Sequence, residues 1–465
     1  MSGATFRRLA ALALLAAPVL LAAPVLLAAG SGAAAGESLT DALVSTYLSN
    51  PQLMAQRSSL KATDESVAQA EGGWRPTVTV TSNSGMGAFM NTTDLPYDSW
   101  RRPTSGAAVF SQPIYQGGRT EAAIGQARSN VQAGEAQLTS TEQTVLLGAA
   151  TAYLDVVRDH ALVELSIANQ KTLYAQRDAV SERFRARQVT LTDISQAEAR
   201  ASGADFDRTA AEVAEQNSVA NYIRIVGRQP DAPFFPTALP ATPPTLDALL
   251  AAARSDNPQI HAADDLVQAA DHAIDLAVGE LLPSVSLNAD ATRNMDTVYP
   301  GSSNGDKQVL LAVTIPIYEA GISYSHVRQA KVTLEQRRSE AEQALVTVIS
   351  NATQAWASLQ VTGAQVVSLG HQVDAAQVAY DSIAEEAKAG RRTVIDMLNA
   401  EQDLFTARSS LVRARHDQLT AAYAVLSSLG QMTARFLALP VPVYDSGRYY
   451  DHVDGRWAGW STETE

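Results

Sequence analysis

The stretch "SNPQLMAQ" (residues 49–56) occurs a second time, as "DNPQIHAA" (residues 256–263), in this chain of 465 residues. The two stretches lie 207 positions apart. The same distance separates Pro76 from Pro283, each of which precedes a run of alternating polar and apolar residues. One protein therefore carries the same arrangement of segments twice.

Two later pairs of similar segments have a slightly different spacing. "QPIY" ends at Tyr115 and "IPIY" at Tyr318, 203 positions later, and Asp193 stands 203 positions before Asp396. The spacing changes once, so the copies differ by four residues in one loop. Self-similarity of this kind marks a repeated structural unit. We predict a first structural repeat at 37–229, a Pro-rich linker at 230–244, a second repeat at 245–438 and a C-terminal tail at 439–465.

The N-terminus has the features of a secretory signal. Two arginines precede an apolar run from Leu9 to Ala29, and small residues follow it. A transmembrane anchor is the alternative, because about 20 apolar residues can cross a bilayer. Pro18 and Pro24 inside the run, and the small residues after it, favour cleavage. Residues 1–36 are therefore predicted to be a signal peptide.

Each repeat is expected to contain the same elements in the same order. In the first, a helix over about residues 39–72 precedes a strand that begins after Pro76, with valines on one face and threonines on the other. A polar loop leads to a second strand that ends before a Gly-Gly pair. A proline-free helix from Arg119 to about Arg187 follows, and after a turn a helix of about 36 residues runs back. In the second repeat, the second strand is "VLLAVTIPIY", expected to end at Gly321.

The long helices carry apolar or small residues every seven positions. These are Ile124, Val131, Leu138, Val145 and Ala152, matched by Val327, Leu334, Ala341, Val348 and Ala355. A sustained heptad predicts coiled-coil packing, and a helix of about 68 residues would be a rod of roughly 100 Å. The predicted fold is mainly α with a small β part. Each repeat forms long antiparallel rods with a strand pair at one end and a tight turn at the other.

The strands predict an assembly of several chains. One chain supplies four strands, whereas about eight is the smallest number that closes a barrel. Open sheet edges favour further pairing. Alternating strands of about ten residues with long loops at one end are typical of outer-membrane barrels. We therefore expect three chains to form a 12-stranded outer-membrane β-barrel joined to a trimeric α-helical barrel.

The composition argues against several other classes of protein. The formal net charge is −14, which disfavours nucleic-acid binding. The chain has no cysteine, so it has no thiol nucleophile and no cysteine for a lipid anchor. Its seven histidines show no metal-ligand spacing, and no nucleophile–base pair is visible. We expect no enzyme activity, no metal and no cofactor.

The sequence resembles the TolC-like outer membrane efflux proteins of Gram-negative bacteria. The resemblance rests on the two Asn-Pro-Gln segments, the "QPIY" and "IPIY" strand ends followed by glycines, and two Asp-x-x-x-Ala-Glu turns. It extends over nearly the whole mature chain and includes the C-terminal tail.

The resemblance implies a function. It implies a homotrimer in the outer membrane lipid, with its helical part and C-terminal tail in the periplasm. Such a protein is the passive exit duct of a tripartite efflux or type I secretion system. Its partners are a periplasmic adaptor and an inner-membrane pump of the ABC or RND type. The alternative is a secreted trimeric coiled-coil adhesin or structural protein without a pore, which would not need strands placed symmetrically in both repeats.

The resemblance also implies a periplasmic entrance at the helix turns. It assigns a gate to Thr192, Asp193, Gly390 and Arg392, in which Arg392 is expected to pair with Asp193 or Thr192, and a pore-lining ring to Asp396 and Asn399. Two residues depart from the family pattern: Ala387 replaces a tyrosine of the gating network, and Asn399 replaces a second ring aspartate. From their spacing alone, the favoured interpretation is that these residues are the solvated tips of the rods; with the resemblance, the gate is favoured.

Four aromatic residues flank the predicted strands. Trp74, Trp100, Tyr115 and Tyr318 are candidates for the girdles at the membrane–water interfaces. Core packing is the alternative for the two tyrosines.

Overall fold

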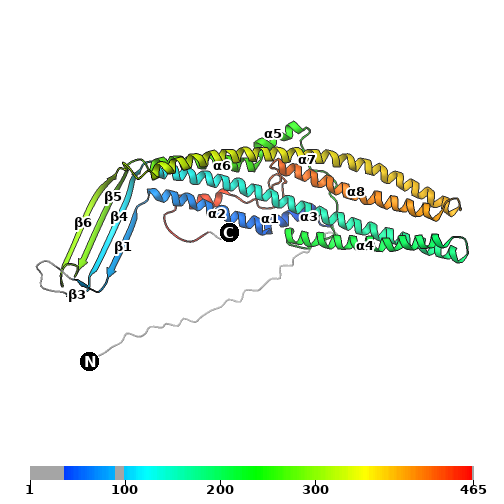
Figure 1. Cartoon of the computed structure of the whole chain (residues 1–465), viewed down its shortest axis with the longest axis horizontal. Coiled ribbons are helices and arrows are strands. Elements are labelled where there is room, and N and C mark those ends of the chain that lie inside the picture. The colour runs from blue at the N-terminus through cyan, green and yellow to red at the C-terminus, as the bar shows by residue number, and fades with distance from the viewer. Residues whose placement is uncertain (1–35, 90–98, 463–465) are drawn as a thin grey trace, which may run out of the picture. The chain divides into compact units, whose positions relative to one another are not determined.

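The computed structural model describes residues 36–89 and 99–462, so the predicted signal peptide lies almost wholly outside the described residues and stays a prediction. The helices of the first repeat are α1 (Leu39–Ser49), α2 (Pro51–Glu71), α3 (Arg119–Arg185) and α4 (Leu191–Val226) (Figure 1). Those of the second are α5 (Leu246–Asp256), α6 (Pro258–Gly279), α7 (Ile322–Lys388) and α8 (Val394–Ser428). A short helix, α9 (Gly447–Val453), lies in the tail.

The repeated Asn-Pro-Gln segments are helix junctions. Asn50 is extended, and its side-chain oxygen accepts hydrogen bonds from the N–H groups of Gln52 (2.9 Å) and Leu53 (3.3 Å) at the start of α2. Pro51 occupies the first helical position, where a missing N–H does no harm. The prediction of one helix over residues 39–72 is therefore wrong, because a capped break at Asn50 divides it.

The same asparagines also bind the ends of the returning helices. The side-chain amide of Asn50 donates to the carbonyl of Ile225 in the last turn of α4 (3.0 Å). In the second repeat, the amide of Asn257 donates to the carbonyl of Ser428 at the end of α8 (2.9 Å). Each segment thus joins a helix start to a helix end, which explains why the chain contains it once per repeat.

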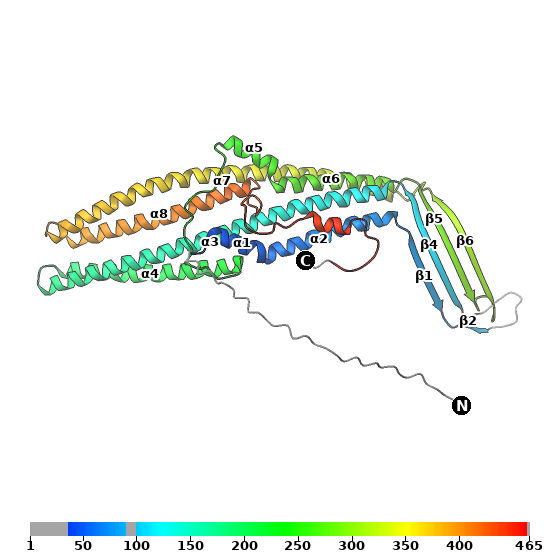
Figure 2. The same cartoon turned by 180° about the vertical axis from the view of Figure 1, so that it is seen from behind.

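The long helices form antiparallel rods, as predicted. Helices α2 and α4 both pack along α3, and α6 and α8 both pack along α7. The two repeats meet where α3 contacts α6 and α8. The sheet lies at one end of the rods and the two helix turns lie at the other (Figures 1 and 2).

The main sheet has four antiparallel strands in the order β1-β4-β5-β6. They are β1 (Thr77–Ser84), β4 (Thr104–Gln116), β5 (Ser284–Met295) and β6 (Ser303–Thr314). The predicted polar loop after β1 contains a small hairpin of β2 (Gly87–Phe89) and β3 (Ser99–Arg101).

One face of this sheet is apolar and the other is largely polar. A row of paired residues across the four strands reads Val78, Phe110, Ala289 and Val309. The adjacent row, on the opposite face, reads Thr79, Val109, Asp290 and Gln308. On the apolar face Val78 is 71% exposed and Val309 is 69% exposed. The sheet therefore shows an uncovered apolar surface, as the alternating sequence predicted.

The second strand of the second repeat is shorter than predicted. It ends at Thr314 instead of near Gly321, whereas β4 continues to Gln116 past an irregularity after Pro113. Both β4 and β6 end where their shared neighbour β5 begins, because Ser284 pairs with Gln116 on one side and with Thr314 on the other. Pro316 also has no N–H to donate to a neighbouring strand.

No helix among the described residues has an apolar stretch long enough to cross a membrane.

The tail runs back from α8 across the first repeat and along α2. The guanidinium of Arg57 on α2 lies between the rings of Tyr47 (4.6 Å) and Tyr444 (4.9 Å). The carboxylate of Glu142 on α3 accepts the N–H of Ala434 (2.6 Å). Burial raises the pKa of Glu142.

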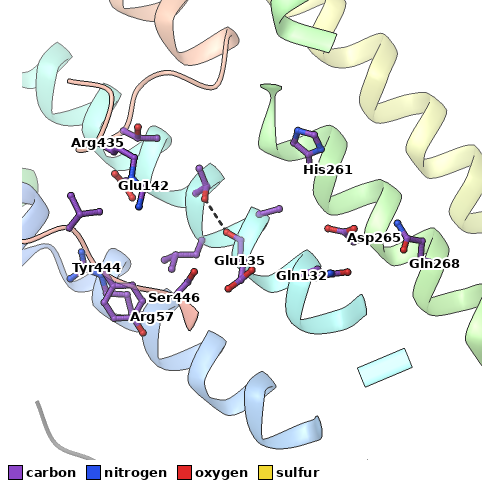
Figure 3. A pocket seen from close by; sticks show the side chains of 15 residues that line it. Arg57, Gln132, Glu135, Glu142, His261, Asp265, Gln268, Arg435, Tyr444 and Ser446 are labelled. Atoms are coloured by element: carbon purple, nitrogen blue, oxygen red, sulfur yellow. Dashed lines mark hydrogen bonds between the residues drawn. The ribbon is translucent and has the colours of Figure 1, made fainter. Parts of the chain in front are cut away.

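A cavity of about 690 Å³ lies between the tail, α2, α3 and α6, and His261 on α6 lines it on the side away from the tail (Figure 3).

Candidate functional site

The two helix turns lie close together at the end of the rods away from the sheet (Figure 1). Val394 and Leu398 at the start of α8 pack in one apolar cluster with residues of the first repeat, namely Leu173, Val180, Ala197 and Ala204. The guanidinium of Arg200 on α4 donates to the side-chain oxygen of Asn399 on α8 (3.2 Å). The chain thus brings both predicted halves of the entrance into one region.

Each turn is followed by a capping box. The hydroxyl of Thr190 donates to the carboxylate of Asp193 (2.8 Å), and the N–H of Asp193 is bonded to that hydroxyl. Thr393 and Asp396 form the same arrangement at the start of α8 (2.7 Å). The Thr190 N–H and hydroxyl lower the pKa of Asp193, and the Thr393 hydroxyl and N–H lower that of Asp396. Both aspartates are therefore held as carboxylates in fixed positions.

This capping role was not predicted, although the sequence signal for it is present. A Thr-x-x-Asp pattern before an apolar helix is a form of the capping box. The sequence analysis used Asp193 and Asp396 to locate the repeat, and the family resemblance alone gave them a role at the entrance. Local hydrogen bonds to Thr190 and Thr393 set the positions of the two carboxylates.

The turns differ at the residue with left-handed backbone. Gly390 has φ +71°, as expected for a turn glycine. Its counterpart in the first repeat is Arg187, which has φ +58°. A residue with a side chain is strained in this conformation, so the first turn carries a local cost that the second does not.

Arg392 is paired within its own turn. Its Nε donates to the carboxylate of Glu386 (2.7 Å), and both side chains are exposed. Asp193 is bonded to Thr190 instead. The predicted contact of Arg392 with Asp193 or Thr192 is therefore not formed among the described residues of one chain.

The two departures from the family pattern have different surroundings. Ala387 is buried near the end of α7. Asn399 is exposed but is held by Arg200. No sequence signal marks Arg200, because it is separated from Asn399 by 199 residues and only the packing of α4 near α8 brings them together.

A charged network between α3 and α8, centred on the buried His416, was also missed. The Nε2 atom of His416 lies 2.9 Å from the carboxylate of Asp155, and its Nδ1 atom lies 2.9 Å from Asp417. Arg158 bonds to Asp155 and to Asp159, both at 2.7 Å. His416 is only 6% exposed, and in the sequence it was one of several scattered histidines. The network joins the two repeats.

The pKa shifts agree with this geometry. Burial lowers the pKa of His416, but the hydrogen bonds to Asp155 and Asp417 more than offset it, so the net shift is upward. For Asp155, burial raises the pKa, and the bonds from His416 and Arg158 produce a net lowering. The charged forms of His416 and Asp155 are therefore favoured.

The predicted girdle residues lie at both ends of the strands. Trp74 precedes β1 in a short 3₁₀ turn, Tyr115 is near the end of β4, and Tyr318 follows β6, all at the helix end of the sheet. Trp100 lies in β3 beyond the opposite end and is 74% exposed. Tyr115 and Tyr318 are 42% and 78% exposed, so neither is a core residue of the single chain. Their contact with lipid stays a prediction.

The described residues contain no cluster of three or more His, Asp or Glu side chains that could hold a metal ion.

Comparison with known proteins identifies the family. The sequence profile described as "Outer membrane efflux protein" matches residues 43–228 and 249–431, one segment in each repeat. The chain is 33% identical over 433 residues to outer membrane efflux protein BepC of Brucella suis biovar 1 (strain 1330), covering 92% of this chain and 93% of that protein. It is 25% identical over 432 residues to outer membrane protein TolC of Escherichia coli (strain K12), covering 86% and 84%. Among solved structures, the Campylobacter jejuni CmeC outer membrane channel shares the fold with a TM-score of 0.77 at 14% identity, covering 90% of this chain and 89% of that one. The chain belongs to the outer membrane efflux protein family.

Proposed function

We propose that three copies of this chain assemble into a passive duct that crosses the outer membrane and extends into the periplasm. As a family member, the chain is an outer membrane exit duct for efflux or type I secretion. In this proposal it catalyses no reaction of its own. A periplasmic adaptor and an inner-membrane pump of the ABC or RND type supply the cargo and the energy.

The observation that supports the proposal best is the unfinished sheet. Within the described part of the chain, its outer strands, β1 and β6, each have one partner. Its apolar face, including Val78 and Val309, is exposed. Three such sheets joined edge to edge would have twelve strands, remove all open edges and direct the apolar faces to lipid. A secreted adhesin would leave this surface in water, so the sheet and the family favour the duct.

We place the gate of the duct at the helix turns. In the trimer, the turns of three chains converge at the periplasmic end. Arg392 and the Glu386 carboxylate that binds it are both exposed, so Arg392 can exchange Glu386 for Asp193 or Thr192 of a neighbouring chain. Guanidinium bonds to a carboxylate and a hydroxyl would hold the turns together. Asp396 and Asn399, in the first two turns of α8, would then line the entrance.

Single-channel recording tests this proposal. The purified protein in mild detergent is expected to have the mass of a trimer and to form pores in planar bilayers. Arg392→Ser should raise the single-channel conductance at low salt, and high salt should reduce the difference because it screens exposed charges. Arg391→Ser removes the adjacent exposed arginine and is the matched control. A monomeric mass would refute the duct, and equal conductance of Arg392→Ser and wild type would refute the gate.

The cargo is tested separately in cells. Deleting the gene should either increase sensitivity to toxic small molecules or abolish release of a secreted protein. Loss of neither would contradict a role in export.

A further inference from the structure

The end of the tail forms a closed loop with the sequence "RWAGWS". The guanidinium of Arg456 donates to the backbone carbonyl of Ser461 (2.9 Å) and to its hydroxyl (3.0 Å), which closes the loop. Gly459 lies inside it with φ +117°, and a Cβ there would come within 2.8 Å of Nη2 of Arg456. The loop is therefore a built structure that needs glycine at this position.

The closed loop presents two tryptophans to its surroundings. Trp457 is 71% exposed and Trp460 is fully exposed. Arg456 closes the loop, yet two of the largest apolar side chains of the chain stay uncovered. Exposed aromatic side chains grouped in this way indicate a contact surface.

Arg75 fixes this loop beside the sheet. Its guanidinium lies 5.4 Å from the centre of the Trp457 ring and donates to the carbonyl of Arg456. It also pairs with Glu71 (2.9 Å) in the last turn of α2. Arg75 precedes the first residue of β1 by two positions. The loop is thus held where the chain passes from helix into the sheet, and Trp74, a predicted girdle residue, is adjacent.

We infer that Trp457 and Trp460 lie in the headgroup region of the periplasmic leaflet of the outer membrane and anchor the tail there. The inference rests on the proposed function, in which the sheet spans that membrane. The loop lies next to the end of the sheet, so the lipid that surrounds the barrel would also contact the loop. Indole rings prefer this region because they combine an apolar body with an N–H donor.

Spin labelling tests the inference, and the absence of native cysteine makes single labels possible. Ala458→Cys places a nitroxide between the two tryptophans, at an exposed residue. The labelled full-length protein is reconstituted in vesicles of phosphatidylethanolamine and phosphatidylglycerol. Collision rates with oxygen, which concentrates in lipid, and with a water-soluble nickel complex give the position of the label.

Two further labels provide the scale. One is attached at Val309→Cys, on the apolar face of β6, and the other at Asp451→Cys, on the exposed side of α9 in the same tail. We expect the ratio of oxygen to nickel collisions to be highest at position 309, lowest at 451 and intermediate at 458. Arg75→Ala, which releases the loop, should shift the value at 458 toward that at 451 and leave 309 unchanged. Trp457→Ser with Trp460→Ser should do the same.

The outcomes separate the inference from the proposed function. If 458 behaves like 451 while 309 is in lipid, the sheet is inserted but the tail is in water, and the inference is wrong. If 458 is protected from both reagents, a protein covers the loop, and the inference is again wrong. If 309 itself is in water, the proposed function fails and the inference fails with it.

Discussion

Helices α3 and α7 are equivalent in the two repeats, and each has 67 residues, but their surroundings differ. On α3, 26 residues are buried, whereas on α7 only six are. Helix α3 contacts helices of both repeats, while α7 lies at the edge of the chain. The strands show the same difference, since β4 has two neighbours and β6 has one.

This difference indicates which surfaces the assembly must cover. A duplicated unit has the same heptads and alternating strands in both copies. The first copy packs against the second within the chain, but no third copy covers the outer side of the second. The exposed apolar residues of α7 and the open edge of β6 are therefore the surfaces that a neighbouring chain would cover.

The largest expected effect is loss of the proposed trimer when the uncovered side of α7 is changed. Val332, Val346 and Val367 lie at multiples of seven positions and are 65%, 60% and 63% exposed. Burying one valine contributes about 1.5–3 kcal/mol, and an aspartate there would also have to be buried as a charge. We expect Val346→Asp to convert the trimer to monomer, measured by light scattering in mild detergent.

The control for this change is Asn351→Asp, which adds the same charge at an exposed position on a different side of α7. It should leave the trimer intact. A stable trimer of Val346→Asp would mean that α7 is not at the subunit interface.

The next effect concerns the contact between the repeats. Removing one partner of a buried ion pair typically costs about 3–5 kcal/mol, so His416→Gln should lower the thermal unfolding midpoint clearly. His160 pairs with Glu215 (2.7 Å) within the first repeat, but its side chain is 47% exposed. Exposed pairs contribute about 0–1 kcal/mol, so His160→Gln should change the midpoint little. If the two substitutions lower the midpoint equally, the contacts of His416 stabilise the fold no more than an exposed ion pair does.

The His416 contact should also depend on pH. Because its pKa is raised in the folded state, its stabilising contribution is complete below the unfolded pKa of about 6.5 and is lost as pH rises through the folded value. The difference in midpoint between wild type and His416→Gln should therefore be larger at about pH 6 than at about pH 9. A difference that grows with pH would contradict the direction of the shift.

Much of this architecture could be predicted because it depends on patterns within one segment. Heptads predicted the rods, and alternation predicted the strands. The break at Asn50 was missed because the helical composition continues across it, although Asn before Pro is a helix-start signal. Contacts between repeats, such as Arg200 with Asn399 and His416 with Asp155, have no local pattern and follow only from how the rods pack.

A smaller effect is expected at the two turns. Arg187 has left-handed backbone, which costs a residue with a side chain roughly 1–2 kcal/mol. Arg187→Gly should raise the unfolding midpoint slightly and slow hydrogen exchange at the first turn. Gly390→Ala should have the opposite effect at the second turn. No neighbouring atom would contact the added Cβ, so only the backbone conformation is penalised. If Gly390→Ala leaves the unfolding midpoint unchanged, the two turns do not differ in backbone strain.

The smallest expected effect distinguishes the two partners of Arg392. Glu386 holds Arg392 within its own turn, and the counterparts in the first repeat, Arg183 and Val189, cannot form this pair. If Glu386 competes with Asp193 of a neighbouring chain, Glu386→Gln should free Arg392 for the gate. The conductance in planar bilayers should then fall slightly below wild type at low salt, the opposite direction to Arg392→Ser. Glu385→Gln, which releases only Lys388, is the matched control and should leave the conductance unchanged. If Glu386→Gln instead raises the conductance as Arg392→Ser does, the pair within the turn is itself the closing contact, and Asp193 has no part in it.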